Sequence, residues 1–197
     1  MSQYKIDPEP GVIYFLTLTV VQWLDIFTKP EYFQIIINSL KHCQRQKNLL
    51  VHAYVIMTNH LHLMVSTRKT GSSAGRPASQ PVLRPASQPV LLSDIIRDFK
   101  SWTAKKIYQQ LIEDNRHYLS EILKTYKSSK NKDFQLWQHD NHAITIKSEK
   151  FFNQKMDYIH NNPVKKRYVE KPEDWLYSSA RNYLLDDYSI IKIDMVE

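Results

Sequence analysis

Two histidines with one residue between them are the first candidates for chemistry in this chain. His60 and His62 lie in the largely apolar run YVIMTNHLHLMVS at 54–66. The run is typical of a β-strand, in which alternate side chains point to the same face, so the two imidazoles should lie together. Such a pair can bind a divalent metal ion. It is equally typical of two structural histidines, and the motif alone does not decide between the two roles.

Tyr158 and Asn162 are the next candidates, in a segment with helical periodicity. Ser148 is expected to cap a helix, EKFFNQKMDYIHNN, that stops at Pro163. At about 100° per residue, Tyr158 and Asn162 share one face of this helix, one turn apart, and face inward beside its apolar stripe. His160 points away from them, so we do not expect it to be a ligand. Asn162 has a plain alternative role as the helix C-cap.

Strand-forming segments bracket the histidines and indicate an α+β fold. Runs of β-branched, aromatic or alternating apolar residues predict strands at 12–21, 49–57, 60–67 and 134–146. With the intervening helices, the order of elements is βαββαβα. Its first six elements predict a ferredoxin-like sandwich, βαββαβ, with an antiparallel sheet and two helices on one face. The C-terminal helix that carries Tyr158 is an addition, free to cover part of the sheet.

Two further helices and an insert complete the pattern. Thr28 and Glu31 match a capping box for a helix after the first strand, and Ser93 is expected to cap a helix that ends near residue 112. Residues 69–92 are rich in Gly, Ser and Pro and contain RPASQPVL twice. Two short copies do not make a solenoid, so we expect an inserted flexible loop. We predict one domain, 1–197, with this insert and a C-terminal extension at 164–197.

The composition limits the class of protein. Lys and Arg outnumber Asp and Glu by 27 to 20, which favours polyanionic partners without separating DNA from RNA or membrane surfaces. Cys43 is the only cysteine, which excludes a disulfide framework and a CxxC metal site and favours a reducing compartment. No run approaches ~18 apolar residues, and the N-terminal segment lacks a signal-peptide pattern. We therefore expect no membrane association and a cytoplasmic location.

Three motifs together resemble the IS200-type transposases. They are MTNHLHLMV, LWQ and DYIHNNPVKKRYVEKPEDWLYSSARNY, and they are most similar to the branch associated with repetitive extragenic palindromes (REP) in bacteria. The likeness runs from about Tyr14 to Tyr183, without the insert. It implies a single-tyrosine nuclease with a His-hydrophobe-His (HUH) motif on a ferredoxin-like core, acting on single-stranded DNA at hairpins. Thr58 stands where the family more often has proline, which should alter the stiffness of the turn more than the chemistry.

The resemblance also implies roles for individual residues. His60 and His62 would bind a divalent metal, Mg²⁺ or Mn²⁺, with Asn162 in the position of a third ligand and Tyr158 as the nucleophile. A tyrosine hydroxyl in water has a pKa of about 10, so a nearby cation has to help it attack a phosphate at neutral pH. The family product is a 5′-phosphotyrosyl link and a free 3′-OH, which permits nicking or strand transfer. Related enzymes include monomers and homodimers with exchanged catalytic helices, and the sequence leaves both open.

Basic residues in two segments are candidates for contact with single-stranded or hairpin DNA in the bacterial nucleoid. They are Arg97 and Lys100 in the second helix, and Lys165, Lys166 and Arg167 after the tyrosine helix. A solvated surface is the ordinary alternative for each group. Two other functions compete: a domesticated single-stranded nucleic-acid-binding protein without turnover, and an RNA-binding module. The RNA-binding module ranks last because its glycine- and aromatic-rich strand motif is not found.

Overall fold

The structure, a computed structural model, describes residues 6, 9–68, 91–127 and 133–196. The insert predicted at 69–92 therefore lies almost wholly outside the described residues. Its last residue does not belong to a loop, because Leu92 begins a helix. Within the described part of the chain, no helix is both long enough and apolar enough to cross a membrane.

Four antiparallel strands form one sheet in the order β2-β3-β1-β4. The strands are β1 (Tyr14–Thr19), β2 (Leu49–Ile56), β3 (His60–Thr67) and β4 (Ile144–Thr145). β3 lies between β1 and β2 and pairs with both along its length, so that His62 stands opposite Thr17 on one side and Val55 on the other. This strand order is that of a ferredoxin-like sandwich, which confirms the predicted fold class.

The fourth strand is much shorter than predicted. The prediction of a strand over 134–146 is wrong for most of that length, because only β4 itself has strand geometry. The preceding residues follow the edge of β1 through separate hydrogen bonds, such as Gln138 N to Thr19 O (2.8 Å). The chain then turns, with Asp140 accepting a hydrogen bond from His142 N and His142 at a φ of 41°. These polar turn residues interrupt the strand ladder.

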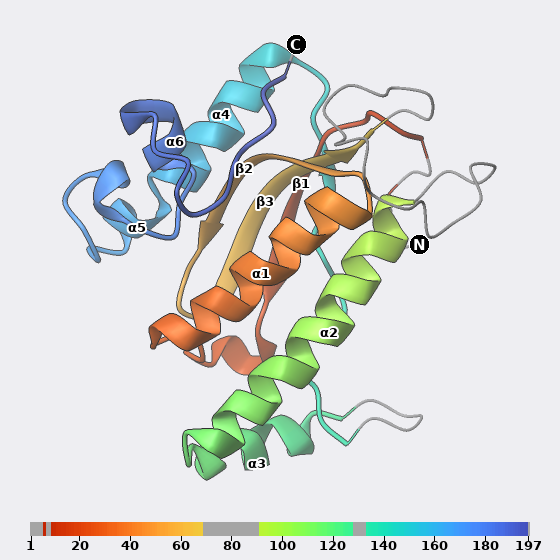
Figure 1. The fold of residues 1–197 in the computed structure, drawn as a ribbon, viewed down its shortest axis with the longest axis vertical. Coiled ribbons are helices and arrows are strands. Elements are labelled where there is room, and N and C mark those ends of the chain that lie inside the picture. The colour runs from red at the N-terminus through yellow and green to blue at the C-terminus, as the bar shows by residue number, and fades with distance from the viewer. Residues whose placement is uncertain (1–5, 7–8, 69–90, 128–132, 197) are drawn as a thin grey trace.

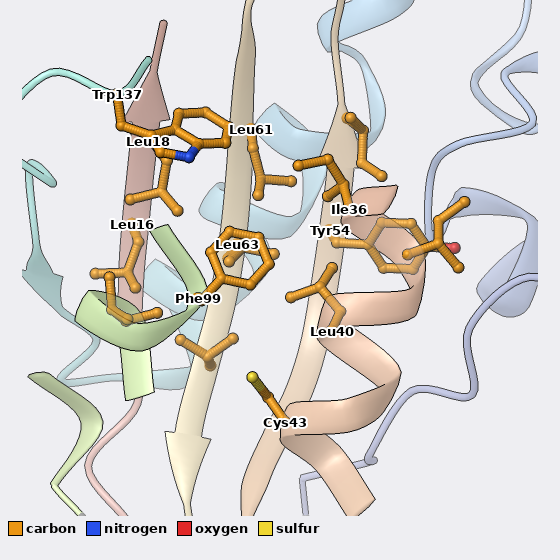
Figure 2. Packing of buried hydrophobic residues seen from close by; sticks show 14 of the residues in the cluster. Leu16, Leu18, Ile36, Leu40, Cys43, Tyr54, Leu61, Leu63, Phe99 and Trp137 are labelled. Carbon is orange, nitrogen blue, oxygen red and sulfur yellow. The ribbon is translucent and has the colours of Figure 1, made fainter. Parts of the chain in front are cut away.

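Helices α1 (Pro30–Gln46) and α2 (Leu92–Glu113) pack against each other over one face of the sheet (Figure 1). A shorter helix, α3 (His117–Thr125), follows α2. Alternate strand residues point toward α1 and α2 and form the main core. Figure 2 shows part of it, with strand residues Leu16, Leu18, Leu61 and Leu63 among helix residues Ile36, Leu40 and Phe99. Each fully buried leucine contributes about 1.5–3 kcal/mol, so this face is the main source of stability.

Helix α4 (Glu149–His160) covers the opposite face of the sheet. Phe15, Val55, Met64 and Ile159 form a second, smaller core there. Because strand side chains alternate, β3 presents its leucines to α1 and α2 and its histidines to the side of α4. The two faces of one strand therefore separate the main core from the candidate site.

The C-terminal part of the chain covers the outer edge of β2. Its regular elements lie beside α4 (Figure 1) and are α5 (Asn162–Lys165), a 3-10 turn (Pro172–Asp174) and α6 (Ala180–Leu185). Backbone hydrogen bonds join it to the strand, from Ile56 N to Tyr177 O (2.9 Å) and from Ser179 N to Tyr54 O (2.9 Å). Trp175 adds a bond from Nε1 to Ile56 O (3.0 Å). Along this stretch β2 is not free to pair with another chain.

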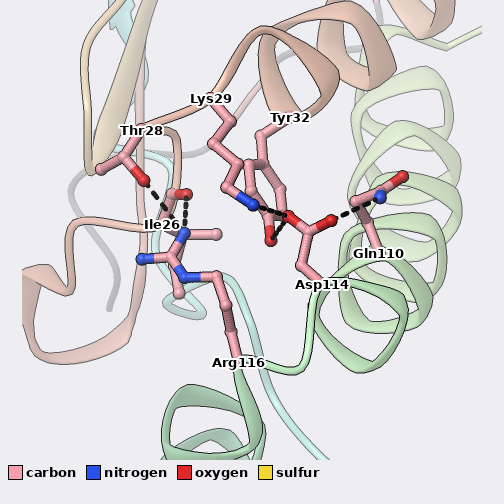
Figure 3. A network of polar contacts seen from close by, with 7 residues as sticks. All are labelled: Ile26, Thr28, Lys29, Tyr32, Gln110, Asp114 and Arg116. Atoms are coloured by element: carbon pink, nitrogen blue, oxygen red, sulfur yellow. Dashed lines mark hydrogen bonds and ion pairs between the residues drawn. The ribbon is translucent and has the colours of Figure 1, made fainter.

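The start of α1 is held by a long-range polar network (Figure 3). Lys29 occupies the N-cap position without a side-chain cap bond. Thr28, predicted to be the cap, instead accepts a hydrogen bond from the Arg116 guanidinium (2.9 Å). Asp114 accepts hydrogen bonds from Lys29 Nζ (3.0 Å) and Tyr32 Oη (2.9 Å). The capping-box prediction is wrong because a residue distant in sequence engages the Thr28 hydroxyl.

The two serines predicted as helix caps behave differently. Ser93 caps nothing, because α2 begins one residue earlier and Leu91 is its N-cap residue. Ser148 does cap α4, since its Oγ accepts a hydrogen bond from Phe151 N (3.3 Å). Comparing Ser148 with Ser93 therefore distinguishes the loss of a capping hydrogen bond from the loss of a serine near the start of a helix.

Replacing Ser148 by alanine is expected to lower the free energy of unfolding by about 1 kcal/mol, because it removes the acceptor for one otherwise unpaired N–H at the start of α4. Ser93→Ala is the control and should change that free energy by less than about 0.5 kcal/mol. Urea denaturation followed by circular dichroism measures both variants. Equal losses would contradict a capping role for Ser148.

Candidate active site

His60 and His62 lie close together on the face of β3 that α4 covers. Their ring centroids are 4.7 Å apart, and the two residues are only 5% and 4% exposed. Burial lowers the pKa of His60 to about 4, and the charge of Lys166 makes a smaller contribution. Burial also lowers the pKa of His62 to about 3, with smaller contributions from His60 and Lys155. Both imidazoles are therefore neutral near pH 7 and keep a lone pair that can bind a metal ion.

The Asn59 side chain fixes which nitrogen of His60 carries a proton. Asn59 Nδ2 donates hydrogen bonds to Asp25 Oδ1 (2.8 Å) and Trp23 O (3.1 Å), so its Oδ1 is turned to His60. That oxygen lies 2.7 Å from His60 Nδ1 and can only accept, so Nδ1 carries the proton and the lone pair is on Nε2. A polar partner behind the ring is the usual arrangement for a metal-binding histidine. Asn59 was not predicted to have this role, although its place directly before the histidine pair was a signal.

His62 Nε2 and Asn162 Oδ1 are the two buried side-chain nitrogen or oxygen atoms, among the residues described, that have no hydrogen-bond partner. The Thr17 hydroxyl lies 2.9 Å from His62 Nδ1 and can accept its proton, which leaves the His62 lone pair on Nε2. An unpaired buried polar atom costs about 1–3 kcal/mol. Imidazole nitrogen and amide oxygen are both ligands for divalent cations, so these residues fit a metal ion.

Asn162 lies in a different element than predicted. α4 ends at His160, Asn161 is its C-cap, and Asn162 begins α5. The C-cap role of Asn162 is therefore wrong, and the single helix predicted to carry both Tyr158 and Asn162 ends between them. Within the described residues, no group of three His, Cys, Asp or Glu side chains is placed to hold a metal. His160, which we did not expect to be a ligand, hydrogen-bonds through Nε2 to Ser179 Oγ (2.9 Å).

Tyr158 lies beside the histidine pair although it is far away in sequence. Its ring makes edge contacts with the rings of His62 (centroids 5.1 Å apart) and Phe15 (5.9 Å apart). The residue is 39% exposed, so it is less inward-facing than predicted. Partial exposure leaves the tyrosine accessible from solvent while one side of its ring is held by the sheet. This placement suits a nucleophile whose substrate is a macromolecule.

Two lysines flank the ring of Tyr158. Lys155 Nζ lies 5.7 Å from the centroid of this ring and 4.6 Å from that of Phe15, and Lys165 Nζ lies 5.5 Å from the centroid of Tyr158. An open cavity of about 340 Å³ lies beside them, lined by Gln154, Lys155, Asp157, Tyr158, Asn161 and Lys165. The cations can balance the charge of a phosphate brought to the tyrosine. Lys155 was missed, although its position three residues before Tyr158 on a helix was a signal.

The other basic candidates divide between the two faces of the sheet. Arg97 and Lys100 belong to α2, on the face opposite the histidines. Arg97 pairs with Asp94 (2.7 Å), and Lys100 Nζ donates to Gln138 O (2.7 Å). The tertiary structure thus does not bring these two residues to the site. Lys165 does adjoin the site, because its Nζ lies over the Tyr158 ring, and the charge of Lys166 contributes to the lowered pKa of His60. Arg167 follows α5.

Comparisons with known proteins agree with this fold. Neither a scan against protein-family models nor a search of curated proteins finds a match. Among solved structures, the chain is similar to a REP-associated tyrosine transposase bound to a REP hairpin, with a TM-score of 0.61 and 20% sequence identity. The match covers 100% of this chain and 94% of the other. At this identity the likeness establishes a shared fold over the whole chain.

Proposed function

We propose that this chain is a metal-dependent DNA transposase or nickase that cleaves and rejoins single-stranded DNA near hairpins. One observation carries the proposal: the ring of Tyr158 lies 5.1 Å from that of His62, whose buried Nε2 has no hydrogen-bond partner. A nucleophile and a neutral metal-binding pair thus meet in one place. The fold supports the proposal, because the similar solved structure is a tyrosine transposase with a hairpin bound. The activity would lie in the bacterial cytoplasm, where the nucleoid is.

The residues of the site divide the chemistry between them. In the proposed step, the Tyr158 oxygen bonds to phosphorus while the bond from phosphorus to the 3′-oxygen breaks. The tyrosine proton passes to solvent, and the departing oxygen takes up a proton to become a free 3′-OH. The resulting 5′-phosphotyrosyl link conserves a phosphodiester bond, so another 3′-OH can attack it and join strands. Lys155 and Lys165 would neutralise the phosphate beside the tyrosine ring.

The proposed metal site consists of His60 Nε2, His62 Nε2 and Asn162 Oδ1. Bound Mg²⁺ or Mn²⁺ would withdraw charge from a non-bridging oxygen of the phosphate. Two imidazoles suit Mn²⁺ better than Mg²⁺, which prefers oxygen ligands.

Phenylalanine in place of Tyr158 is expected to abolish covalent attachment to DNA, because it removes only the nucleophilic oxygen. The assay incubates the protein with hairpin DNA that carries single-stranded flanks, in Mn²⁺ or Mg²⁺, and separates adducts on a denaturing gel. Tyr118→Phe, an exposed tyrosine on α3, is the matched control and should form the adduct like the wild type. An unchanged adduct in Tyr158→Phe would show that the nucleophile is another residue. Hairpin binding by a wild type that forms no adduct would favour the domesticated binding protein instead.

Alanine in place of His62 or Asn162 is expected to weaken Mn²⁺ binding by at least about tenfold, because each change removes a proposed ligand. Titration calorimetry without DNA measures this, with the exposed His142→Ala as control. Because burial holds the pKa values of His60 and His62 near 4 and 3, protons compete with the metal only in that acidic range. Binding should therefore persist at pH 5.5, where ordinary histidines of pKa about 6.5 are mostly protonated. Loss of binding near pH 6.5 would contradict neutral, buried ligands.

We expect the double substitution Lys165→Gln and Lys166→Gln, which removes two positive charges, to weaken binding of hairpin DNA regardless of the DNA sequence. Each lost phosphate contact should reduce the slope of log affinity against log salt concentration by about 1. Fluorescence anisotropy over a range of salt concentrations gives both quantities. Arg97→Gln is the control, because this arginine pairs with Asp94 and Asp98 on the opposite face. An equal effect of Arg97→Gln would place the DNA elsewhere on the surface.

A further inference from the structure

Trp23 is a large apolar side chain that the fold leaves exposed next to the candidate site. The residue is 55% exposed, and its ring makes an edge contact with the ring of His60, with the centroids 5.5 Å apart. The whole of α1 and β2 lies between Trp23 and His60 in the sequence, so the tertiary fold makes this contact. An exposed indole in this position is unexplained by the packing of either core.

The backbone that presents Trp23 has an unfavourable conformation. Gln22 and Trp23 are consecutive residues other than glycine with positive φ, at 54° and 55°. Side chains with a Cβ avoid this region, and such residues concentrate at functional sites when the surroundings hold them there. Here the surroundings are the turn before β3, because Val20 N donates to Asn59 O (2.9 Å) and Asn59 Nδ2 donates to Trp23 O (3.1 Å). The side chain that orients His60 thus also holds Trp23.

Four rings form a continuous row across the site. Successive ring centroids are 5.5 Å apart from Trp23 to His60, 4.7 Å from His60 to His62 and 5.1 Å from His62 to Tyr158. The nucleophile is at one end of the row, the metal-binding pair is in the middle, and the exposed indole is at the other end. A phosphate held in the middle would have its neighbouring nucleotides at the two ends.

We propose that Trp23 is a stacking platform for an unpaired base of the DNA strand, next to the phosphate that Tyr158 attacks. This inference rests on the proposed function and names a further binding residue for the same site. An indole face binds any base by stacking, and such platforms work together with cations that hold the backbone. Two such cations adjoin the site. Lys165 Nζ lies over the Tyr158 ring, and the charge of Lys166 contributes to the lowered pKa of His60. The nearby carboxylate of Asp25 is engaged by Thr58 and Asn59 (2.5 and 2.8 Å).

The experiment measures the affinity of the full chain for an oligo-dT strand of about 20 nucleotides, by anisotropy, in the absence of metal so that no cleavage occurs. Trp23→Ala is expected to lower the affinity between about 5-fold and 100-fold, the range of one stacked base. Trp23→Phe keeps a stacking face and should retain most of the affinity. Trp102→Ala is the matched control, because Trp102 is also exposed (44%) but lies on α2.

A second strand in which every base is replaced by an abasic site completes the test. The proposal requires that wild type and Trp23→Ala bind this strand equally, because stacking is then impossible. Equal binding of oligo-dT by wild type and Trp23→Ala, or no binding by the wild type, would overturn it. The adduct assay reports separately on the proposed function: an adduct with no effect of Trp23→Ala leaves a transposase without this platform. A Trp23-dependent affinity without an adduct leaves a stacking site on a protein that only binds DNA.

Discussion

The candidate site depends on the pairing of β1 with β3. In the observed register Thr17 is opposite His62 and Thr19 is opposite His60, while Leu61 faces the main core. A slip of one residue would exchange the two faces of the strand and bury the histidines under α1 and α2. The leucines of β3 oppose such a slip, because burying them is the main contribution of this strand to stability. The hydrophobic core therefore determines where the histidines point.

The same sheet gives the histidines their chemical state. Burial beneath α4 keeps both imidazoles neutral, and it also leaves His62 Nε2 and Asn162 Oδ1 without hydrogen-bond partners. Two buried polar atoms without hydrogen-bond partners lower the stability of the folded protein. In the proposed metal site a divalent cation would bind both atoms, which would offset this loss of stability.

The parts of the site are held by segments that also complete the fold. α4 covers the second face of the sheet and carries Tyr158, and the residues after α5 cover the edge of β2. Asn59 joins the turn before β3 to the loop of Trp23 and orients His60. In the proposed reaction these contacts keep the nucleophile, the histidines and the stacking face in fixed positions. Preorganisation of this kind is what phosphate transfer to a side chain requires.

Local periodicity in the sequence was sufficient for the order of the four strands and of the helices α1, α2 and α4, for the ferredoxin-like fold and for the shared face of His60 and His62, because strand alternation and helical repeats are short-range properties. The short helices α3, α5 and α6 were not predicted. The cap at Ser148 was equally local. The tertiary structure decided everything that depends on distant partners. Arg116 donates a hydrogen bond to the Thr28 hydroxyl, which was predicted to cap α1. α4 ends before Asn161, so that Asn162 begins a separate helix. Only the packing of α2 and α4 on opposite faces of the sheet kept Arg97 and Lys100 away from the site and brought Lys155 to it. Trp23 lies there because Asn59 in the turn before β3 bonds its backbone. Contacts between segments far apart in sequence leave no periodic signal.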